Sequence, residues 1–310
     1  MKLARVCKSS FKYLTNSKYR FLINAGLGMY NKMADAEFLK KKYFACMGKN
    51  LDLDSPKTFN EKLQWIKLYD RNPEYTMMVD KYLVREYIKE KLGEEYLIPL
   101  LGVWDDPDEI DFDALPDRFV LKCNHNSGLG MYICKDKTKM DVDKVKAELR
   151  KGLAQDYYLT GREWPYKNVP RKIIAEQYME DEKTSELRDY KFFCFNGSAK
   201  FFKIDFDRFV SHRANYFDQN GEILNFGEVV CPPDFERELS MPQNFELMKT
   251  FAETLSKDIP FVRVDFYEAN GKVYFGEITF FPAAGFGPFE PEEWDEILGE
   301  WIELPVDKSC

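Results

Sequence analysis

Apolar residues recur at helical spacing through the first part of the chain, and this pattern predicts helices there. The helices are predicted at residues 18–47, 60–69 and 76–92. Thr58 and Glu61 have the spacing of a capping box, which marks the start of the second helix, and Gly93 can end the third. Residues 1–95 are therefore predicted to form a helical N-terminal region.

Short apolar runs with strand character replace the helical pattern after residue 118. Strands are predicted at residues 119–123, 131–134, 172–178, 189–196, 198–205, 261–267 and 272–280, with a further pair around residues 218–221. Further helices are predicted at residues 141–155, 244–258 and 294–302. Asn196-Gly197 and Asn270-Gly271 are strong hairpin signals. The order predicts an α+β fold, with a small lobe at 96–175, a large lobe at 176–310 and a cleft between them.

The composition narrows the class of protein. Aromatic residues make up 16% of the chain, which favours a firmly packed core. The seven cysteines include no C-x-x-C pair, and two histidines are too few for a histidine-rich metal site. The longest apolar stretch near the start is about ten residues, against roughly 20 for a membrane span. We therefore expect a cytoplasmic protein.

The charge is distributed unevenly along the chain. Residues 1–50 carry eleven basic and two acidic residues, a net charge of +9, whereas residues 51–310 carry −17. A basic segment of this kind suits an anionic membrane surface or an anionic polymer, and it equally suits a solvated helical face. Peripheral contact with the inner membrane face, or with a lipid-linked glycan there, is thus one open hypothesis. The acidic remainder makes nucleic acid a poor partner.

The last predicted hairpin carries charged side chains on one face. Arg263 and Asp265 are two residues apart on its first strand, and Glu277 and Thr279 are two apart on its second. Two carboxylates on adjacent strands can hold Mg²⁺ through oxygen ligands, and the arginine can stabilise negative charge. A cross-strand ion pair on a solvated face would give the same pattern, so both interpretations stay open at this point.

Two further segments have features of nucleotide binding. Lys122 ends an apolar strand and precedes a polar turn with two glycines, residues 124–130, whose backbone N–H groups could approach phosphate oxygens. Glu176 lies near the end of another apolar strand, and the connector that follows could bond the edge of adenine. An ordinary tight turn and a buried strand with one solvated glutamate are the alternatives.

In this order, a lysine hairpin, a hinge strand and an Asp…Glu hairpin resemble the ATP-grasp superfamily, and its TupA-like branch in particular. The motifs that carry the resemblance are Thr58-Phe59-Asn60-Glu61-Lys62-Leu63-Gln64-Trp65, Asp80-Lys81, Phe119-Val120-Leu121-Lys122-Cys123-Asn124-His125, Asp189-Tyr190-Lys191-Phe192, Cys194-Phe195-Asn196-Gly197 and Gly276-Glu277-Ile278-Thr279-Phe280. They span about residues 50–290. The resemblance implies an ATP-grasp fold, in which two α+β lobes hold a nucleotide in the cleft between them.

The resemblance also implies roles for individual residues. Nucleotide binding falls to Lys81, Lys122, Asn126, Ser127, Gly128, Glu176, Gln177, Met179 and Asp189. Asp265, Glu277 and Thr279 would hold Mg²⁺, and the catalytic residues would be Arg263 and Lys191. Many ATP-grasp enzymes have asparagine where this chain has Thr279, so a second metal ion is less well supported than the first. A Rossmann-like N-terminal lobe, usual in the superfamily, is not evident in residues 1–95.

The implied activity is that of an ATP-dependent carboxylate–amine ligase, which forms an amide through an acyl-phosphate. TupA-like proteins are associated with surface polysaccharides, so the expected partners are a uronic acid and an amino acid or other amine. Arg208, His212 and Arg213 could bind the acid carboxylate, although a basic surface loop is an equal alternative. A glycosyltransferase, suggested by Asp205-Phe206-Asp207, and a non-catalytic glycan-binding protein are the rival classes.

Overall fold

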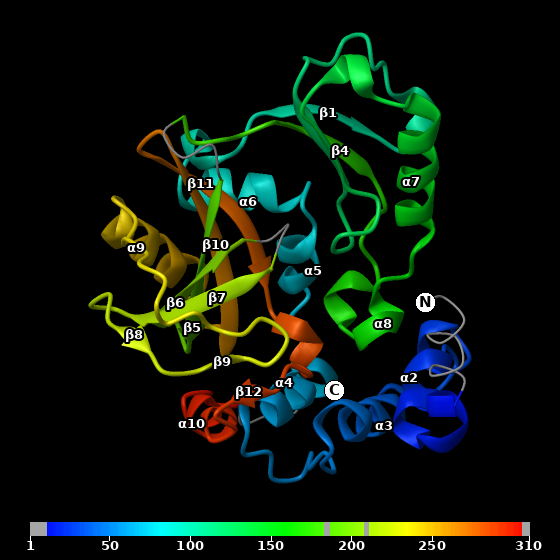
Figure 1. Ribbon diagram of the computed structural model, residues 1–310, viewed down its shortest axis with the longest axis vertical. Helices are drawn as coiled ribbons and strands as arrows, with labels where there is room; N and C mark the ends of the chain where they lie inside the picture. The colour runs from blue at the N-terminus through cyan, green and yellow to red at the C-terminus, as the bar shows by residue number, and fades with distance from the viewer. Residues whose placement is uncertain (1–10, 183–186, 208–210, 306–310) are drawn as a thin grey trace.

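The computed structural model describes residues 11–182, 187–207 and 211–305, and it begins with helices that pack beside the rest of the molecule (Figure 1). The single helix predicted over residues 18–47 is wrong, because α2 (Ser17–Gly26) and α3 (Asp35–Met47) are separate. Gly28 adopts a φ of +78°, which a right-handed helix cannot contain. The chain turns there and lays α2 against α3.

The predicted capping box is confirmed at the start of α4 (Phe59–Tyr69). The Glu61 N–H donates to the Thr58 hydroxyl at 3.3 Å, and the Glu61 carboxylate accepts the Thr58 N–H at 3.1 Å. This reciprocal pair satisfies backbone donors that a helix start leaves open.

The helix predicted over residues 76–92 is also wrong as a single element. It is divided into α5 (Glu74–Val79) and α6 (Val84–Lys91), with a break at Asp80. The buried Asp80 carboxylate accepts the N–H groups of Tyr82 and Leu83 at 2.8 and 3.2 Å, and it also accepts the side-chain amide of Asn124 at 2.8 Å. A side chain that competes for backbone N–H groups in this way favours a cap over a continuous helix.

Four described strands form the smaller sheet, which is antiparallel, with strand order β1-β4-β2-β3. They are β1 (Leu100–Trp104), β2 (Phe119–Cys123), β3 (Tyr132–Cys134) and β4 (Ile173–Gln177), and α7 (Val142–Ala154) packs beside them, followed by α8 (Tyr158–Gly161). Sequence reasoning missed β1, because its residues do not alternate between buried and exposed and include Gly102. Beneath the sheet, a small core includes Phe119, Leu121 and Leu149.

Six strands of the described chain form the larger sheet in the order β11-β10-β5-β6-β7-β8, and all neighbours are antiparallel. They are β5 (Arg188–Phe195), β6 (Ser198–Phe206), β7 (Arg213–Asp218), β8 (Ile223–Leu224), β10 (Phe261–Ala269) and β11 (Lys272–Thr279). α9 (Phe245–Leu255) packs against this sheet, α10 (Trp294–Glu300) packs against α4, and β9 (Gly227–Glu228) pairs with β12 (Phe289–Glu290). Short 3₁₀ turns occupy Glu94–Tyr96, Pro107–Glu109, Lys137–Lys139, Trp164–Tyr166 and Pro282–Gly285.

Both predicted Asn-Gly hairpins are confirmed. Asn196 and Gly197 have φ values of +50° and +80°, and Asn270 and Gly271 have +52° and +74°. Positive φ at both central residues matches the right-handed twist of the flanking strands, which is why this dipeptide predicts a hairpin so well.

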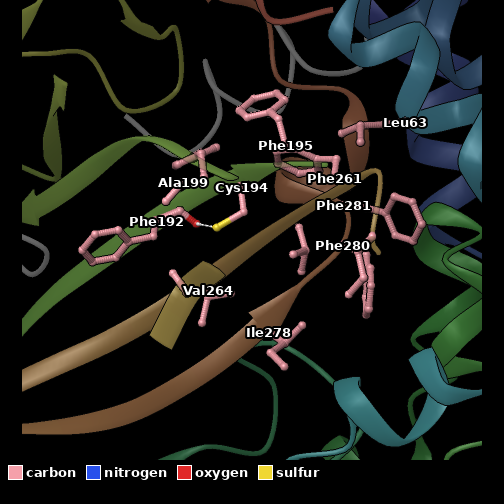
Figure 2. Packing of buried hydrophobic residues seen from close by; sticks show 14 of the residues in the cluster. Leu63, Phe192, Cys194, Phe195, Ala199, Phe261, Val264, Ile278, Phe280 and Phe281 are labelled. Carbon is pink, nitrogen blue, oxygen red and sulfur yellow. Dashed lines mark hydrogen bonds between the residues drawn. The ribbon is translucent and has the colours of Figure 1, made fainter. Parts of the chain in front are cut away.

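Aromatic side chains dominate the core of the larger lobe. Phe195 and Phe261, on neighbouring strands, have ring centroids 5.1 Å apart, and Phe59 of α4 meets Phe261 edge-on at 4.8 Å. Figure 2 shows Phe195, Phe261 and Leu63 among the residues of this cluster. Helix α4 is thus part of the same core as the larger sheet. The lobe boundaries predicted at residues 95 and 175 stay predictions. Strand β4 of the smaller sheet ends at Gln177, two residues past the second of them.

Gly299 offers a direct test of the packing between α10 and α4. An added Cβ would overlap the Lys57 carbonyl oxygen, which belongs to the backbone and cannot turn away. Gly299→Ala should therefore destabilise the protein by about 1–3 kcal/mol through overpacking, although alanine in a helix normally gains about 1 kcal/mol over glycine. Urea unfolding measures the difference. Gly26→Ala is the matched control, because nothing lies within 4 Å of its Cβ position, and it should be neutral or stabilising.

Candidate active site

A row of charged side chains crosses one face of the larger sheet. In the strand register Glu277 lies opposite Asp265, Asp265 opposite Lys191, and Lys191 opposite Lys203. Residues directly opposite in neighbouring strands share a face, so these four side chains form one continuous charged row. The register thus explains how residues about 70 positions apart along the chain come together.

Arg263 joins the two predicted metal carboxylates. Its guanidinium donates two hydrogen bonds to the Asp265 oxygens, both at 2.7 Å, and further bonds to Glu277 at 3.0 Å and to the Thr279 hydroxyl at 3.1 Å. The paired bonds to Asp265 have the bidentate geometry that guanidinium groups favour. The hairpin therefore brings the predicted Arg263, Asp265, Glu277 and Thr279 together.

Lys191 lies at the centre of a buried carboxylate group. Its ammonium lies 2.6 Å from both Asp189 and Asp265, and 3.7 Å from Asp205. Burial alone would lower the pKa of Lys191, but these carboxylates outweigh burial and raise it. The lysine is therefore a permanent cation that holds three strands together through their side chains.

Glu277 differs from Asp265 in its exposure. The Glu277 side chain is 39% exposed, whereas that of Asp265 is 1% exposed. Burial would raise the pKa of Glu277, but the nearby cations, with Lys81 and Arg263 the strongest, lower the pKa to about 2. Burial raises the pKa of Asp265, and Arg263 and Lys191 oppose that rise. Glu277 is thus an ionised carboxylate that is accessible from solvent.

The depressed pKa of Glu277 predicts a pH dependence of stability. Its folded pKa of about 2 lies below its ordinary value of 4.5, so its contribution is fully present above about pH 4.5 and is lost as the pH falls towards 2. Wild-type protein should therefore be more stable than Glu277→Gln at neutral pH, and the difference should shrink below pH 4.5. Urea unfolding at a series of pH values measures this. A constant difference down to pH 3 would contradict it.

A pocket lies between the two sheets, beside α5 and α6, with about 440 Å³ of empty space that includes the solvent at its mouth. Its lining combines apolar side chains with charged ones and consists of Met78, Val79, Lys81, Val84, Arg85, Leu97, Ile98, Lys122, Tyr166, Glu176, Phe275, Gly276, Glu277 and Ile278. In Figure 1, α5 and α6 lie between the smaller and the larger sheet. Predicted phosphate, hinge and metal residues therefore meet at one pocket.

The hinge glutamate is held by two cations. Lys122 lies 2.6 Å from Glu176, which it meets diagonally across the β2–β4 pairing, and Arg85 lies 3.5 Å from the same carboxylate. Arg85 also donates to the Ile98 carbonyl at 2.9 Å. Sequence reasoning missed Arg85, because a single arginine on a helix with many charged residues gives no signal of its own.

Lys81 occupies the break between α5 and α6. Its backbone N–H donates to the Asn124 carbonyl at 3.1 Å, and its ammonium donates to the Asn126 carbonyl at 2.7 Å. Burial lowers the pKa of Lys81, against the opposing effect of Glu277. The lysine is thus fixed to the predicted phosphate loop and lines the pocket at the same time.

The other predicted nucleotide residues are placed less directly. The Asn126 side chain is buried and donates to the Gly152 carbonyl at 3.1 Å, so it anchors the loop on α7. Gly128 has a φ of +84° and open space around its Cβ position, as a backbone that approaches a ligand requires. Burial raises the pKa of the Tyr157 hydroxyl, and the neighbouring Ser127 side chain opposes that rise. Gln177 ends β4, with its N–H bonded to the Pro99 carbonyl at 3.0 Å.

Met179 follows β4 in the connector and is half-buried, and it does not belong to the pocket lining. The resemblance assigned Met179 a role through its backbone, as a contact for adenine, and that role stays a prediction. Asp189, which was predicted to bind the nucleotide, pairs with Lys191 on the larger sheet and is not among the residues that line the pocket.

Two of the predicted substrate residues, His212 and Arg213, lie near the Lys203 end of the charged row. Arg208 falls outside the described residues, and Arg213 donates to the Pro233 carbonyl at 3.0 Å. His212 has its Nε2 atom 3.4 Å from Asp205. Within the described ranges, Asp205, His212 and Cys231 also offer ligand atoms within 4.8 Å of one another. Lys203 lies 3.5 Å from Asp205 and from Glu228, so its ammonium already balances the carboxylate charge at this end of the row.

Comparison with known proteins gives a family match. The model of the family described as TupA-like ATPgrasp matches residues 61–303, which is most of the chain. Among curated proteins, no match is found.

Several solved structures are similar in fold. They include D-alanine–D-alanine ligase from Bacillus anthracis complexed with ATP, at 14% identity and a TM-score of 0.39, covering 66% of this chain and 54% of that one. The Helicobacter pylori D-alanine–D-alanine ligase is 14% identical with a TM-score of 0.42, covering 80% and 70%. This chain thus spans little more than half the length of the Bacillus anthracis enzyme. These likenesses are too distant to bear on substrate or reaction.

Proposed function

We propose that this protein is an ATP-dependent ligase that joins a carboxylate to an amine, because the chain belongs to the TupA-like ATP-grasp family. The predicted α+β fold of the ATP-grasp kind is confirmed with that family. The resemblance drawn from the sequence is likewise confirmed. The reaction type, the substrates and the roles of individual residues are the proposal.

One observation carries the proposal more than any other. Glu277 lines the pocket between the sheets and also belongs to the charged row on the larger sheet. The pocket has apolar side chains such as Val79, Leu97 and Ile278, which suit a flat base, together with Lys81 and Lys122, which suit phosphates. A nucleotide bound with its phosphates towards Glu277 would therefore reach the charged row with its transferable group.

The side chains near Glu277 suit Mg²⁺ in part. Glu277 is ionised and accessible, and the Thr279 hydroxyl lies 3.3 Å from it, so two hard oxygen donors are adjacent. Both Asp265 oxygens are bonded by Arg263, so Asp265 would ligate a metal only after the guanidinium turns away. A bound Mg²⁺ ion would neutralise negative charge on the phosphates. Glu277 would be its principal ligand, with Asp265 as the second.

The protein's own residues would then act by binding and charge neutralisation. Lys81 and Lys122 would bind phosphate oxygens, Lys81 from the break between α5 and α6 and Lys122 from β2. Arg263, with its five donors, would stabilise the negative charge that develops when the carboxylate is activated and when the amine attacks. Lys191 would position Asp265 and would not need to touch the substrates.

The chemistry balances with a carboxylate, an amine and ATP. A carboxylate oxygen attacks the terminal phosphorus, and ADP leaves. The amine nitrogen then attacks the carbonyl carbon, phosphate leaves and the nitrogen loses a proton. The proposed carboxylate is a uronic acid of a surface polysaccharide or its precursor, and the amine is an amino acid or a related compound. His212 and Arg213, at the far end of the row, are the proposed contacts for the acid.

The rival classes find less support in the geometry. A glycosyltransferase would use both carboxylates of Asp205-Phe206-Asp207 on a nucleotide-sugar, but Asp205 is buried beside Lys191 and Lys203. A glycan-binding module would present aromatic rings at its surface. Most large aromatic side chains here, including Phe192 and Phe201, are buried in the core instead.

The decisive experiment measures ADP and phosphate release from Mg²⁺-ATP with a panel of uronic acids and amines. Release that requires both an acid and an amine supports the ligase. Consumption of a nucleotide-sugar without ATP would refute it in favour of a transferase, and no ATP binding at all would favour a non-catalytic protein.

A variant pair ties the activity to the pocket. Lys122→Met should weaken ATP binding by roughly tenfold or more, because it removes a cation that contacts phosphate. Lys139→Met is the matched control, since that lysine is 81% exposed and lies outside the pocket. Isothermal titration with the nucleotide compares the two. Equal affinities in both variants would remove Lys122 from the site.

A further inference from the structure

Helix α2 has one face packed and one face open to solvent. Phe21 lies on the packed face, where its ring stacks on Tyr30 at 4.9 Å and meets Phe38 at 5.9 Å. Arg20, Ile23 and Leu27 are spaced i, i+3 and i+7, so they share the opposite face. Leu27, the C-cap residue that follows α2, is 73% exposed, which is a high exposure for a large apolar side chain.

The helical turn before α2 extends the same surface. Residues 11–15 are helical, and Phe11 and Leu14, three residues apart, are 69% and 72% exposed. The Arg20 guanidinium donates to the Leu14 carbonyl at 3.2 Å, which brings this turn beside the open face of α2. We call this surface the apolar-basic face. Its members are Phe11, Lys12, Leu14, Arg20, Ile23 and Leu27.

The segment that carries the apolar-basic face is rich in basic residues. Residues 11–50 contain eight basic and two acidic residues, a net charge of +6. Both acids are engaged by other groups, because Asp35 accepts the Tyr158 hydroxyl at 2.6 Å and Glu37 pairs with Lys41 at 3.2 Å. The positive charge of Lys12 and Arg20 is therefore available to an anionic partner, unlike that of a surface compensated by neighbouring acids.

We propose that the apolar-basic face docks on the surface of an anionic phospholipid bilayer. Cations flanking exposed leucine and phenylalanine side chains are the pattern of a helix that lies in a membrane interface. A soluble anionic polymer would use the cations but not the apolar side chains. A second copy docking face to face would bring equal positive charges together. Within the residues that the structure describes, no helix has the length and apolar character to span a bilayer.

This inference is independent of the proposed ligase reaction. The apolar-basic face belongs to the N-terminal helices, and none of its residues lines the pocket between the sheets. Docking would hold the protein at a membrane surface without altering the chemistry in the pocket. A substrate carried on a lipid would then meet the enzyme at high local concentration.

The test is co-sedimentation of the full chain with two kinds of vesicle. One contains phosphatidylcholine alone, and the other contains phosphatidylcholine with phosphatidylglycerol. We expect the protein to sediment with the anionic vesicles and not with the neutral ones, and added salt should weaken the association. Equal partition to both kinds, or to neither, would overturn the proposal. The proposal would also be overturned if the protein bound soluble polyphosphate and anionic vesicles did not compete for that binding.

Two paired variants locate the contact. Leu14→Asn with Leu27→Asn removes apolar contact, and Lys12→Gln with Arg20→Gln removes charge; each pair should lower vesicle affinity by roughly tenfold or more. The matched controls are Val230→Asn with Phe235→Asn, and Lys139→Gln with Lys272→Gln, all exposed side chains elsewhere. Melting temperatures close to that of the wild type confirm that each variant is folded. Equal losses in variants and controls would refute this face as the contact.

Discussion

Replacing Glu277 with glutamine should lower ligase turnover by about a hundredfold or more, because the accessible carboxylate at the pocket would no longer ligate Mg²⁺. The neutral amide has nearly the same shape, so packing should change little. Turnover is measured as ADP release under saturating ATP, acid and amine. We expect a large loss of turnover because of the position of Glu277. This residue belongs both to the pocket lining and to the charged row that includes Lys191.

The control for this variant is Glu296→Gln, which changes an exposed glutamate on α10 that is not among the residues lining the pocket. It should keep full turnover. Raising the Mg²⁺ concentration should restore part of the activity of Glu277→Gln, since Asp265 and Thr279 remain. Full turnover in Glu277→Gln at ordinary Mg²⁺ would refute the metal assignment, whatever the state of the other residues.

Replacing Lys191 with methionine should have the largest effect on stability, a loss of about 3–5 kcal/mol in the free energy of unfolding. Methionine fills nearly the same volume, but Asp189 and Asp265 would stay buried without the cation that lies 2.6 Å from each. Urea unfolding at neutral pH measures the loss. The fold should survive if the protein's total stability is ordinary, and the midpoint should move to lower urea.

A double variant separates charge from packing. In Lys191→Met with Asp189→Asn, one of the buried carboxylates becomes neutral, so the combined loss should be smaller than the sum of the two single losses. Additive losses would mean that the two side chains do not interact. A loss below about 1 kcal/mol for Lys191→Met alone would show that water reaches these carboxylates and screens them.

The hairpins could be predicted from the sequence because their signals are local. Asn270-Gly271 dictates a positive-φ turn, and once the turn is fixed, the alternation of side chains fixes which residues share a face. Alternation places Arg263 and Asp265 on one face, but Glu277 joins that face only because the strand register shifts by one residue between Asp265 and Phe266. The breaks in the helices were not predictable in this way. Asp80 breaks its helix partly through Asn124, a partner 44 residues away in the sequence.

The sequence predicts which residues form the site better than it predicts the contacts between them. Motif spacing indicated Lys122, Glu176 and Glu277, and all three line one pocket. Nothing in the spacing shows that Arg263 would bond both oxygens of Asp265, because rotamer choice depends on every neighbouring charge. Arg85 and Lys203 were missed for a related reason. Each gains its meaning from a carboxylate on another element, Glu176 or Asp205.

The break at Asp80 has a mechanical consequence. Asp80 and Lys81 are bonded to Asn124 and Asn126, which follow β2, and Arg85 reaches Glu176 on β4. Polar contacts thereby tie α5 and α6 to the smaller sheet, while their apolar side chains belong to the core of the larger lobe: Tyr75, Met78, Val79, Val84 and Ile88. If the two sheets swing apart to admit a nucleotide, Lys122 and Glu176 should move with the smaller sheet and Glu277 should stay with the larger one. The segment around Lys81, which contacts both, should then act as the hinge, so closure itself would assemble the site.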